Sequence, residues 1–169
     1  MKRELTLTDI AGYLDHPLLG QHPTGAICWI DVEFIAHHGI SLAGYKPVLR
    51  PMSDLYVEIT DKDYNGGKLF VPIVELANLL GESKIYQWEL HSDGRCAFSP
   101  EAMDYFRWLE EEKSFVHSLS YCEFSTGYVI FNQHEMYDLL HRLHFDYRGL
   151  IPVGLAVSVH DLERNLYEK

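Results

Sequence analysis

The spacing of apolar residues along the chain predicts several helices. In several of them apolar positions recur three or four residues apart, and most begin at a Thr, Ser, Asn or Pro, residues that cap or open helices. The longest predicted helix opens at Ser99-Pro100 and continues to about His117, with Phe106 and Val116 on its apolar face. The predicted helices cover residues 6–14, 53–58, 72–80, 99–117 and 132–145, and a last one starts near residue 160.

Turn dipeptides and alternating residues predict strands and hairpins. Asp93-Gly94 and Asn65-Gly66 are dipeptides that tight hairpin turns favour. Predicted strands cover residues 26–36, 68–71, 84–91, 95–98, 121–124, 128–131 and 156–159, whereas residues 20–25 are expected to form a loop. Helices and hairpins without a regular strand–helix–strand repeat indicate an α+β fold, in which antiparallel hairpins pack with about five helices. Since the chain has no internal repeat or long linker, residues 1–169 are predicted to form a single domain.

The net charge of the chain is −11, from 25 acidic against 14 basic residues. Proteins bind nucleic acid or anionic membranes without sequence specificity through clustered Lys and Arg, so we expect neither direct nucleic-acid binding nor membrane binding. No apolar run approaches the roughly 20 residues of a membrane span. The first residues also lack the apolar core of a signal peptide, so none is expected.

The cysteines Cys28, Cys96 and Cys122 are widely spaced and form no Cys-x-x-Cys pair. This pattern is typical neither of a disulfide framework nor of a zinc cluster. Free thiols are typical of a reducing compartment. We therefore expect a cytoplasmic protein without a bound cofactor.

Acidic residues are concentrated between Glu101 and Asp138, where eight acids stand against two bases. Most such runs are solvated helix faces, but this one also contains aromatic residues, which favour the centres of protein interfaces. A basic partner protein, including one that itself binds nucleic acid, would be steered to such a surface. The predicted partner-binding residues are Glu101, Asp104, Trp108, Glu110, Glu111 and Glu112.

His134, Asp138 and His141 are expected on one polar face of the helix predicted at 132–145. Two imidazoles and a carboxylate can ligate a metal ion, and a small metal-dependent hydrolase would use such a set. The two histidines are seven positions apart, however, or roughly 10 Å along the helix axis, whereas a catalytic zinc helix places them four apart. A solvated polar face is therefore the simpler interpretation.

Asp61, Asp63 and Asn65-Gly66 match the opening of a calcium-binding loop, in which alternate oxygens surround the ion. Such a loop needs a glutamate at its twelfth position, which here is Pro72. A polar turn without metal is therefore the preferred interpretation. No serine or cysteine stands in a recognised nucleophile motif, so no catalytic residue is assigned.

Two stretches of the chain share motifs with a known group of proteins. One runs Lys46-Pro-Val-Leu-Arg-Pro-Met-Ser-Asp-Leu55 and is followed by Phe70-Val-Pro72; the other runs His144-Phe-Asp146, then Gly149-Leu-Ile151 and Gly154-Leu-Ala156. In this order the motifs resemble those of uncharacterised small proteins of phages, prophages and mobile elements of gut anaerobic bacteria. The resemblance implies a phage or mobile-element origin and a bacterial host cytosol. It implies no reaction, because those proteins have no known activity.

Within these stretches we expect Arg50 and Asp54 to form an internal ion pair. We expect His144 and Asp146 to belong to a buried, hydrogen-bonded polar network rather than to a functional site.

The sequence favours a non-enzymatic phage or mobile-element accessory protein that acts by protein–protein interaction through its acidic surface. Inhibition of a host defence system is one candidate role. Two alternatives stay open: a small metal-dependent hydrolase that uses His134, Asp138 and His141, and a component of a virion. The sequence does not set the oligomeric state.

Overall fold

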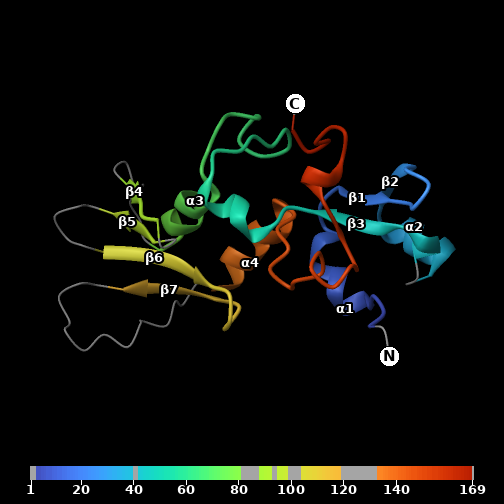
Figure 1. The fold of residues 1–169 in the computed structure, drawn as a ribbon, viewed down its shortest axis with the longest axis horizontal. Coiled ribbons are helices and arrows are strands. Elements are labelled where there is room, and N and C mark those ends of the chain that lie inside the picture. The colour runs from blue at the N-terminus through green and yellow to red at the C-terminus, as the bar shows by residue number, and fades with distance from the viewer. Residues whose placement is uncertain are drawn as a thin grey trace. The chain divides into compact units, whose positions relative to one another are not determined.

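The computed structural model describes residues 3–39, 42–80, 88–92, 95–98, 104–118 and 133–168. Contacts within the chain divide it into two compact units, both visible along the ribbon in Figure 1. Unit 1 comprises Met1–Met52 and Asp138–Tyr167, and unit 2 comprises Ser53–Tyr137 and Glu168–Lys169. The division into two compact units does not test whether the chain is one domain, so the single domain stays a prediction.

Unit 1 contains a four-stranded mixed sheet in the order β2-β1-β3-β8 (Figure 1). Its strands are β1 (Leu18–Gln21), β2 (Ile27–Ile30), β3 (Lys46–Leu49) and β8 (Val157–Ser158). β1 pairs antiparallel with both β2 and β3, whereas β8 pairs parallel with β3. The turn between β1 and β2 contains Gly25, whose φ of 89° lies in the left-handed region that glycine adopts without strain.

Short helices complete unit 1. They are α1 (Leu7–Ile10), the 3₁₀-helix η1 (Ala11–Tyr13) that continues it, α2 (Val32–His38), and the 3₁₀-helices η2 (Leu42–Gly44) and η4 (Val159–Asp161). Asp9 stabilises the start of α1, because its Oδ2 accepts hydrogen bonds from the amide and the hydroxyl of Thr6. Asp31 caps α2 by accepting a 2.7 Å hydrogen bond from the amide of Phe34.

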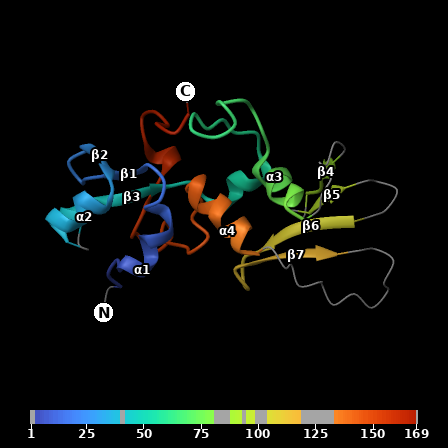
Figure 2. The ribbon, with the colours of Figure 1, turned by 180° about the vertical axis from the view of Figure 1, so that it is seen from behind.

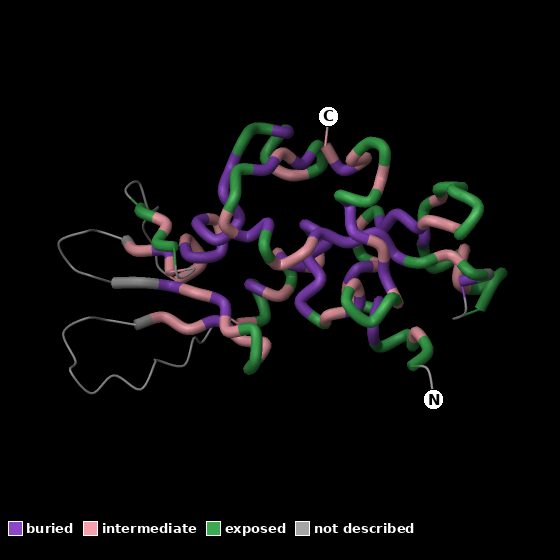
Figure 3. Tube along the Cα trace, viewed as in Figure 1, coloured by how far each residue is buried: buried purple, intermediate pink, exposed green. Residues whose placement is uncertain are grey.

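The helix α4 (Gln133–Arg142) contributes residues to both units. Its apolar face was predicted from the sequence and is confirmed, since Met136 and Leu140 are fully buried, and so is Leu143 just after the helix. Figure 3 shows the buried stretches of the chain in purple. The core of unit 1 is formed by Ile10, Tyr13, Leu18, Leu19, Ile30, Val48, Leu49, Leu140, Leu143, Phe145 and Leu150.

Two predictions for unit 1 are wrong. The loop expected over residues 20–25 begins too early, because β1 continues to Gln21 between β2 and β3. The strand expected over residues 26–36 ends at Ile30, and α2 follows. Asp31 changes the structure here, because a residue that caps a helix start ends the strand before it.

Unit 2 contains a four-stranded antiparallel sheet in the order β4-β5-β6-β7. Its strands are β4 (Trp88–Leu90), β5 (Cys96–Phe98), β6 (Asp104–Leu109) and β7 (Ser114–Ser118). The helix α3 (Pro72–Asn78) contacts β6, and the 3₁₀-helix η3 (Met52–Tyr56) leads into the unit. Figure 1 and Figure 2 both show β6 and β7 side by side as the longest strands.

The long helix predicted over residues 99–117 is wrong, because residues 104–118 form β6 and β7. Phe106 and Trp108 are both buried, two positions apart, as on one face of a strand. Phe106 stacks on Phe115 of β7 with ring centroids 5.1 Å apart and planes 8° from parallel. Aromatic residues favour strands, and their packing across β6 and β7 stabilises the hairpin more than the helical spacing of apolar residues in this segment favours a helix.

Several other predictions are confirmed. α3 begins at Pro72, α4 follows the predicted range, and β4 with β5 forms the hairpin predicted around Asp93-Gly94. Asn65 and Gly66 both have positive φ, as a tight turn requires, although the strand expected at 68–71 is reduced to one bridge between Ile59 and Phe70. The α+β class is therefore confirmed.

Some predictions fall on residues outside those that the structure describes. They concern the turn residues Asp93-Gly94 themselves, the opening Ser99-Pro100, and the strands at 121–124 and 128–131. Among the described residues, no helix is long and apolar enough to cross a bilayer.

Candidate functional site

The predicted acidic surface lies on a hairpin turn rather than on a helix face. Glu110, Glu111 and Glu112 follow β6 and are exposed, as Figure 3 shows for the turn between β6 and β7. With Lys113 they form the tip of the hairpin, here named the acidic tip (residues 110–113). Asp104 is the first residue of β6, and Glu101 lies outside the described residues.

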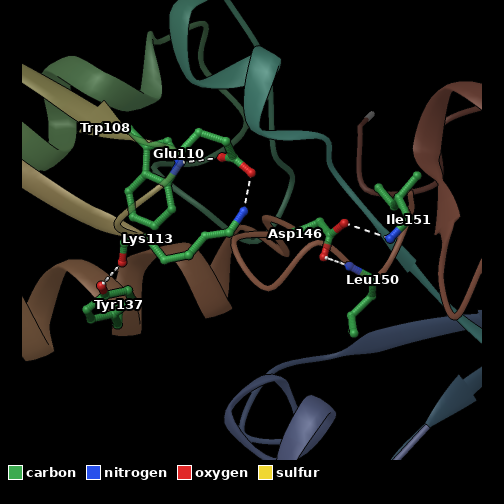
Figure 4. Close-up of polar contacts among 7 residues, drawn as sticks. All are labelled: Trp108, Glu110, Lys113, Tyr137, Asp146, Leu150 and Ile151. Carbon is green, nitrogen blue, oxygen red and sulfur yellow. Dashed lines mark hydrogen bonds and ion pairs between the residues drawn. The ribbon is translucent and has the colours of Figure 1, made fainter. Parts of the chain in front are cut away.

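Glu110 is bound within the acidic tip. Its Oε2 accepts a 2.7 Å hydrogen bond from the indole N–H of Trp108, and its Oε1 accepts from the ammonium of Lys113 (Figure 4). Partial burial acts to raise the pKa of Glu110, but the contacts with Lys113 and Trp108 outweigh it and leave this pKa below its usual value. The carboxylate is therefore ionised at neutral pH and fixed in direction.

Trp108 supports the acidic tip from inside. The residue is 8 % exposed, and its ring meets Phe115 edge to face with centroids 4.9 Å apart. Its amide donates a 3.3 Å hydrogen bond to the hydroxyl of Tyr56. Trp108, predicted as a partner-binding residue, thus lies mostly in the core and positions Glu110 instead of presenting a broad aromatic face.

Lys113 closes the turn. Its φ of 49° is left-handed, which is uncommon for a residue with a side chain and needs support from its surroundings. The hydroxyl of Tyr137 provides that support by donating a 2.5 Å hydrogen bond to the carbonyl of Lys113 (Figure 4). The backbone of the acidic tip is therefore fixed at its far end, while Glu111 and Glu112 extend into solvent.

The acidity of the chain is concentrated in unit 2. Unit 2 contains 16 acidic against 7 basic residues, whereas unit 1 contains 9 against 7. Most of the net charge of −11 therefore belongs to the unit that carries the acidic tip. A field of one sign around a fixed turn can orient an approaching partner of opposite charge.

The structure does not bring the predicted metal ligands together. Among the described residues, no group of three or more His, Cys, Asp and Glu side chains is placed to hold a metal ion. His134 is on the exposed face of α4, with its side chain 74 % exposed, and Asp138 is also exposed. His141, in contrast, points inward, so the expected polar stripe is divided between solvent and core.

His141 belongs to a packed cluster of unit 1. Its Nε2 is 2.8 Å from the hydroxyl of Tyr147, and its ring meets Tyr13 edge to face at 4.9 Å. Gly12 makes room for this ring, because a Cβ at that position would stand 2.3 Å from the ring carbon Cε1. Burial, helped by the positive charge of Arg148, lowers the pKa of His141.

Asp146 has a structural role, as predicted for a buried polar network. Its Oδ1 accepts from the amide of Leu150 and its Oδ2 from the amide of Ile151, both at 2.7 Å (Figure 4). The carboxylate is buried and closes the turn that follows α4. Both oxygens are used by the backbone, which indicates a fixed turn rather than a ligand site.

The calcium-like segment is a hydrogen-bonded turn. Asp61 is buried, and its Oδ1 accepts a 3.0 Å hydrogen bond from the amide of Asp63. The side-chain oxygen of Asn65 accepts from the amide of Lys68 at 3.0 Å. These oxygens stabilise the chain in the way that Asx turns do, which supports the interpretation as a polar turn.

Comparison with known proteins identifies no relative of this chain. No protein-family model, no curated protein and no solved structure matches the chain.

Proposed function

We propose that the protein acts without catalysis by binding a basic partner protein through the acidic tip. The observation that supports the proposal most directly is the way the tip is held. Glu110 is bound by Trp108 and Lys113, and the backbone of Lys113 is bound by Tyr137, while Glu111 and Glu112 are free to meet a partner. A turn fixed before binding loses less conformational entropy when the complex forms.

The partner that fits the acidic tip presents Arg or Lys side chains on a convex or extended surface. Two exposed carboxylates on adjacent residues can meet guanidinium groups in paired hydrogen bonds. The charge of unit 2 would increase the rate of encounter and make it sensitive to salt. Proteins that bind nucleic acid carry such basic surfaces, so they form the partner class that we favour.

The biological setting of the proposal comes from the motif resemblance. In that setting the protein would be an accessory protein of a phage or mobile element, located in the cytosol of a bacterial host. Inhibition of a host defence protein is the candidate role. The metal-dependent alternative gains no support, because His141 is packed against Tyr13 and Tyr147.

The test compares two double variants of equal net charge. E111Q/E112Q removes the exposed charges of the acidic tip, whereas E4Q/E163Q removes two exposed charges of unit 1. Each tagged protein captures partners from a bacterial lysate at low and at high salt, and mass spectrometry identifies the retained proteins. We expect wild type and E4Q/E163Q to retain the same basic protein at low salt, and E111Q/E112Q to lose it. Equal retention by both variants, or retention that salt does not change, would contradict the proposal.

A further inference from the structure

The hydroxyl of Tyr167 takes the place of a strand pairing in unit 1. β1 and β3 pair at Gly20 with Pro47 and at Gln21 with Lys46, and the same register would next bring Leu19 opposite Val48. Instead, the amide of Leu19 donates a 2.9 Å hydrogen bond to the Tyr167 hydroxyl, which donates at 3.0 Å to the carbonyl of Val48. Tyr167 therefore bridges the two strands where their ladder ends.

The residues before Tyr167 cover the same part of the sheet. Leu162 and Leu166 pack against a cluster formed by Leu19, Val48, Val159 and Tyr167. Residues 162–167 are here named the latch segment. Residues 162–167 form no regular helix or strand. Leu162 caps the end of η4, and the amide of Tyr167 donates a hydrogen bond to the side chain of Asn165. Tyr167 and these two leucines attach the segment to β1 and β3.

His144 completes the closed position of the latch segment. Its ring lies flat against the ring of Tyr167, with centroids 4.1 Å apart and planes 11° from parallel. The residue is 4 % exposed, and its φ of 61° holds it in a left-handed turn after α4. Within the described part of the chain, neither ring nitrogen makes a hydrogen bond of normal geometry, although the carbonyl of Pro17 acts on the ring.

The groups around His144 disfavour a second positive charge. The fully buried Arg50, which follows β3, has its guanidinium carbon 5.7 Å from the ring centre of Tyr167. His16, between η1 and β1, and His141 of α4 also act electrostatically against a positive charge on the ring, whereas the carbonyl of Pro17 favours it. Burial first, and Arg50 second, lower the pKa of His144 to about 3. The ring is therefore neutral while the segment is closed.

We propose that the latch segment is released by acid: it stays closed while His144 is neutral against Tyr167, and opens when His144 takes a proton from solvent. An imidazolium buried beside Arg50 is costly even with the carbonyl of Pro17 near the ring, whereas the open state lets water solvate it. Opening breaks the two hydrogen bonds of Tyr167 and uncovers Leu19 and Val48. The device thus converts a fall in pH into an exposed apolar face on unit 1.

The amide of Leu19 is a direct reporter of this opening, because it is bonded to the Tyr167 hydroxyl in the closed state. Its protection factor in amide hydrogen exchange follows the population of the open state. With an open-state pKa of about 6.5 for His144, the protection factor should fall about 25-fold between pH 7 and pH 5. Amides of the β1–β2 ladder, at Gly20 and Cys28, should keep higher protection factors than Leu19 at both pH values, because opening of the latch segment leaves that ladder closed.

Three variants of the full chain separate the parts of the device. H144N removes the titrating ring, and asparagine tolerates the left-handed backbone of this position, so the pH dependence at Leu19 should disappear. H144F keeps a flat ring against Tyr167 and should give the same result if it folds. Y167F keeps the stacking but loses both hydrogen bonds, so Leu19 should be less protected at every pH while its pH dependence remains.

The control is H134Q, which removes an exposed histidine of α4 and should leave the pH dependence unchanged. The proposal is overturned if H144N keeps the wild-type pH dependence. It is equally overturned if Leu19 and the amides of the β1–β2 ladder have the same protection factor at every pH, since the whole unit and not the latch segment would then open.

Discussion

The hydroxyl of Tyr13 donates a 2.7 Å hydrogen bond to the carbonyl of Phe145, a residue 132 positions later in the sequence. Both side chains are fully buried. Tyr13 ends η1, and Phe145 follows α4 and bridges to Arg50 beside β3. This single bond therefore connects the first helical segment of unit 1 to the turn that carries His144 and Asp146.

Removing the Tyr13 hydroxyl should destabilise unit 1. Tyr13→Phe leaves the buried carbonyl of Phe145 without its donor, which costs about 1–3 kcal/mol. Burial raises the pKa of Tyr13, so the phenol keeps its proton and the loss should be independent of pH through the neutral range. Urea denaturation followed by circular dichroism measures the loss. Tyr64→Phe is the control, because that hydroxyl bonds to Glu75 in a less buried place; an equal loss would contradict the prediction.

Asp146 should be more sensitive to substitution than an exposed aspartate. Asp146→Ala leaves the amides of Leu150 and Ile151 without their acceptor and should lower the free energy of unfolding by about 2–4 kcal/mol. Asp146→Asn keeps one acceptor oxygen and should lose about half as much. Asp138→Ala, at an exposed position of α4, should change stability by less than about 0.5 kcal/mol. Thermal and urea denaturation of the three variants rank these effects.

Gly12 should tolerate no side chain while His141 keeps its position. In Gly12→Ala the new methyl group would overlap the imidazole, and the shift needed should cost about 1–3 kcal/mol. A double-mutant cycle with His141→Ala isolates the clash, because Gly12→Ala should be nearly neutral once the ring is gone. Additive losses in the cycle would show that the two residues do not compete for space.

Unit 1 should lose stability in mild acid. The folded-state pKa values of His144, His141 and His16 are all lowered by burial, so the unfolded chain binds more protons than the folded chain below the unperturbed histidine pKa. Stability is then complete above about pH 6.5 and falls as the pH decreases, by about 1.4 kcal/mol per pH unit for His144 alone while its ring stays buried and neutral.

Urea midpoints between pH 7.5 and pH 4.5 measure this slope. In His144→Asn the slope should decrease by the equivalent of one proton, whereas His134→Gln should retain it. A stability that does not change over this range in the wild type would show that these rings protonate without cost.

The acidic tip should loosen when Tyr137 loses its hydroxyl. Tyr137→Phe removes the hydrogen bond to the Lys113 carbonyl and should cost about 0.5–1.5 kcal/mol in unit 2. In a W29F/W88F background, where Trp108 is the remaining tryptophan, acrylamide should quench fluorescence more strongly in the Tyr137→Phe variant. Unchanged quenching would show that the turn holds its conformation without Tyr137.

The elements that sequence patterns predicted correctly have strong local markers. Pro72 opens α3, and Asp93-Gly94 separates the two strands of a hairpin. For α4, the apolar positions Met136 and Leu140 repeat at helical spacing over enough turns to exclude a strand. In each case the local preference and the burial in the folded unit agree.

The incorrect predictions lie where tertiary packing outweighs local spacing. In β6 and β7 the turn contains Glu110 to Lys113 and no glycine, so no turn dipeptide marked it, and Lys113 takes the left-handed conformation that glycine usually supplies. The alternation of Phe106 and Trp108 was the marker available in the sequence. Strand β1 has only four residues with Gly20 inside, which is too short for a periodic pattern.

The residues of the acidic tip could be predicted from the sequence, but their place in the fold could not. Composition identified Glu110, Glu111 and Glu112 as an acidic group, but it placed them on a helix, and only the fold shows that Trp108 is buried beneath them. His144 and Tyr167 are 23 positions apart, and no short-range pattern brings them together. Contacts of this kind become visible only when the whole of unit 1 is assembled.

The two parts of unit 1 lie on either side of unit 2 in the sequence, and this order has a consequence for biosynthesis. Val48 of β3 finds its partner Val157 only after Ser53–Tyr137 has been translated, which takes on the order of ten seconds at typical bacterial rates. Unit 2 is nearly continuous and can fold as it emerges, whereas β1, β2 and β3 must wait with Leu19 and Val48 uncovered. Slow codons within the stretch that encodes unit 2 would lengthen this interval, and the nascent chain would then depend more on ribosome-associated chaperones.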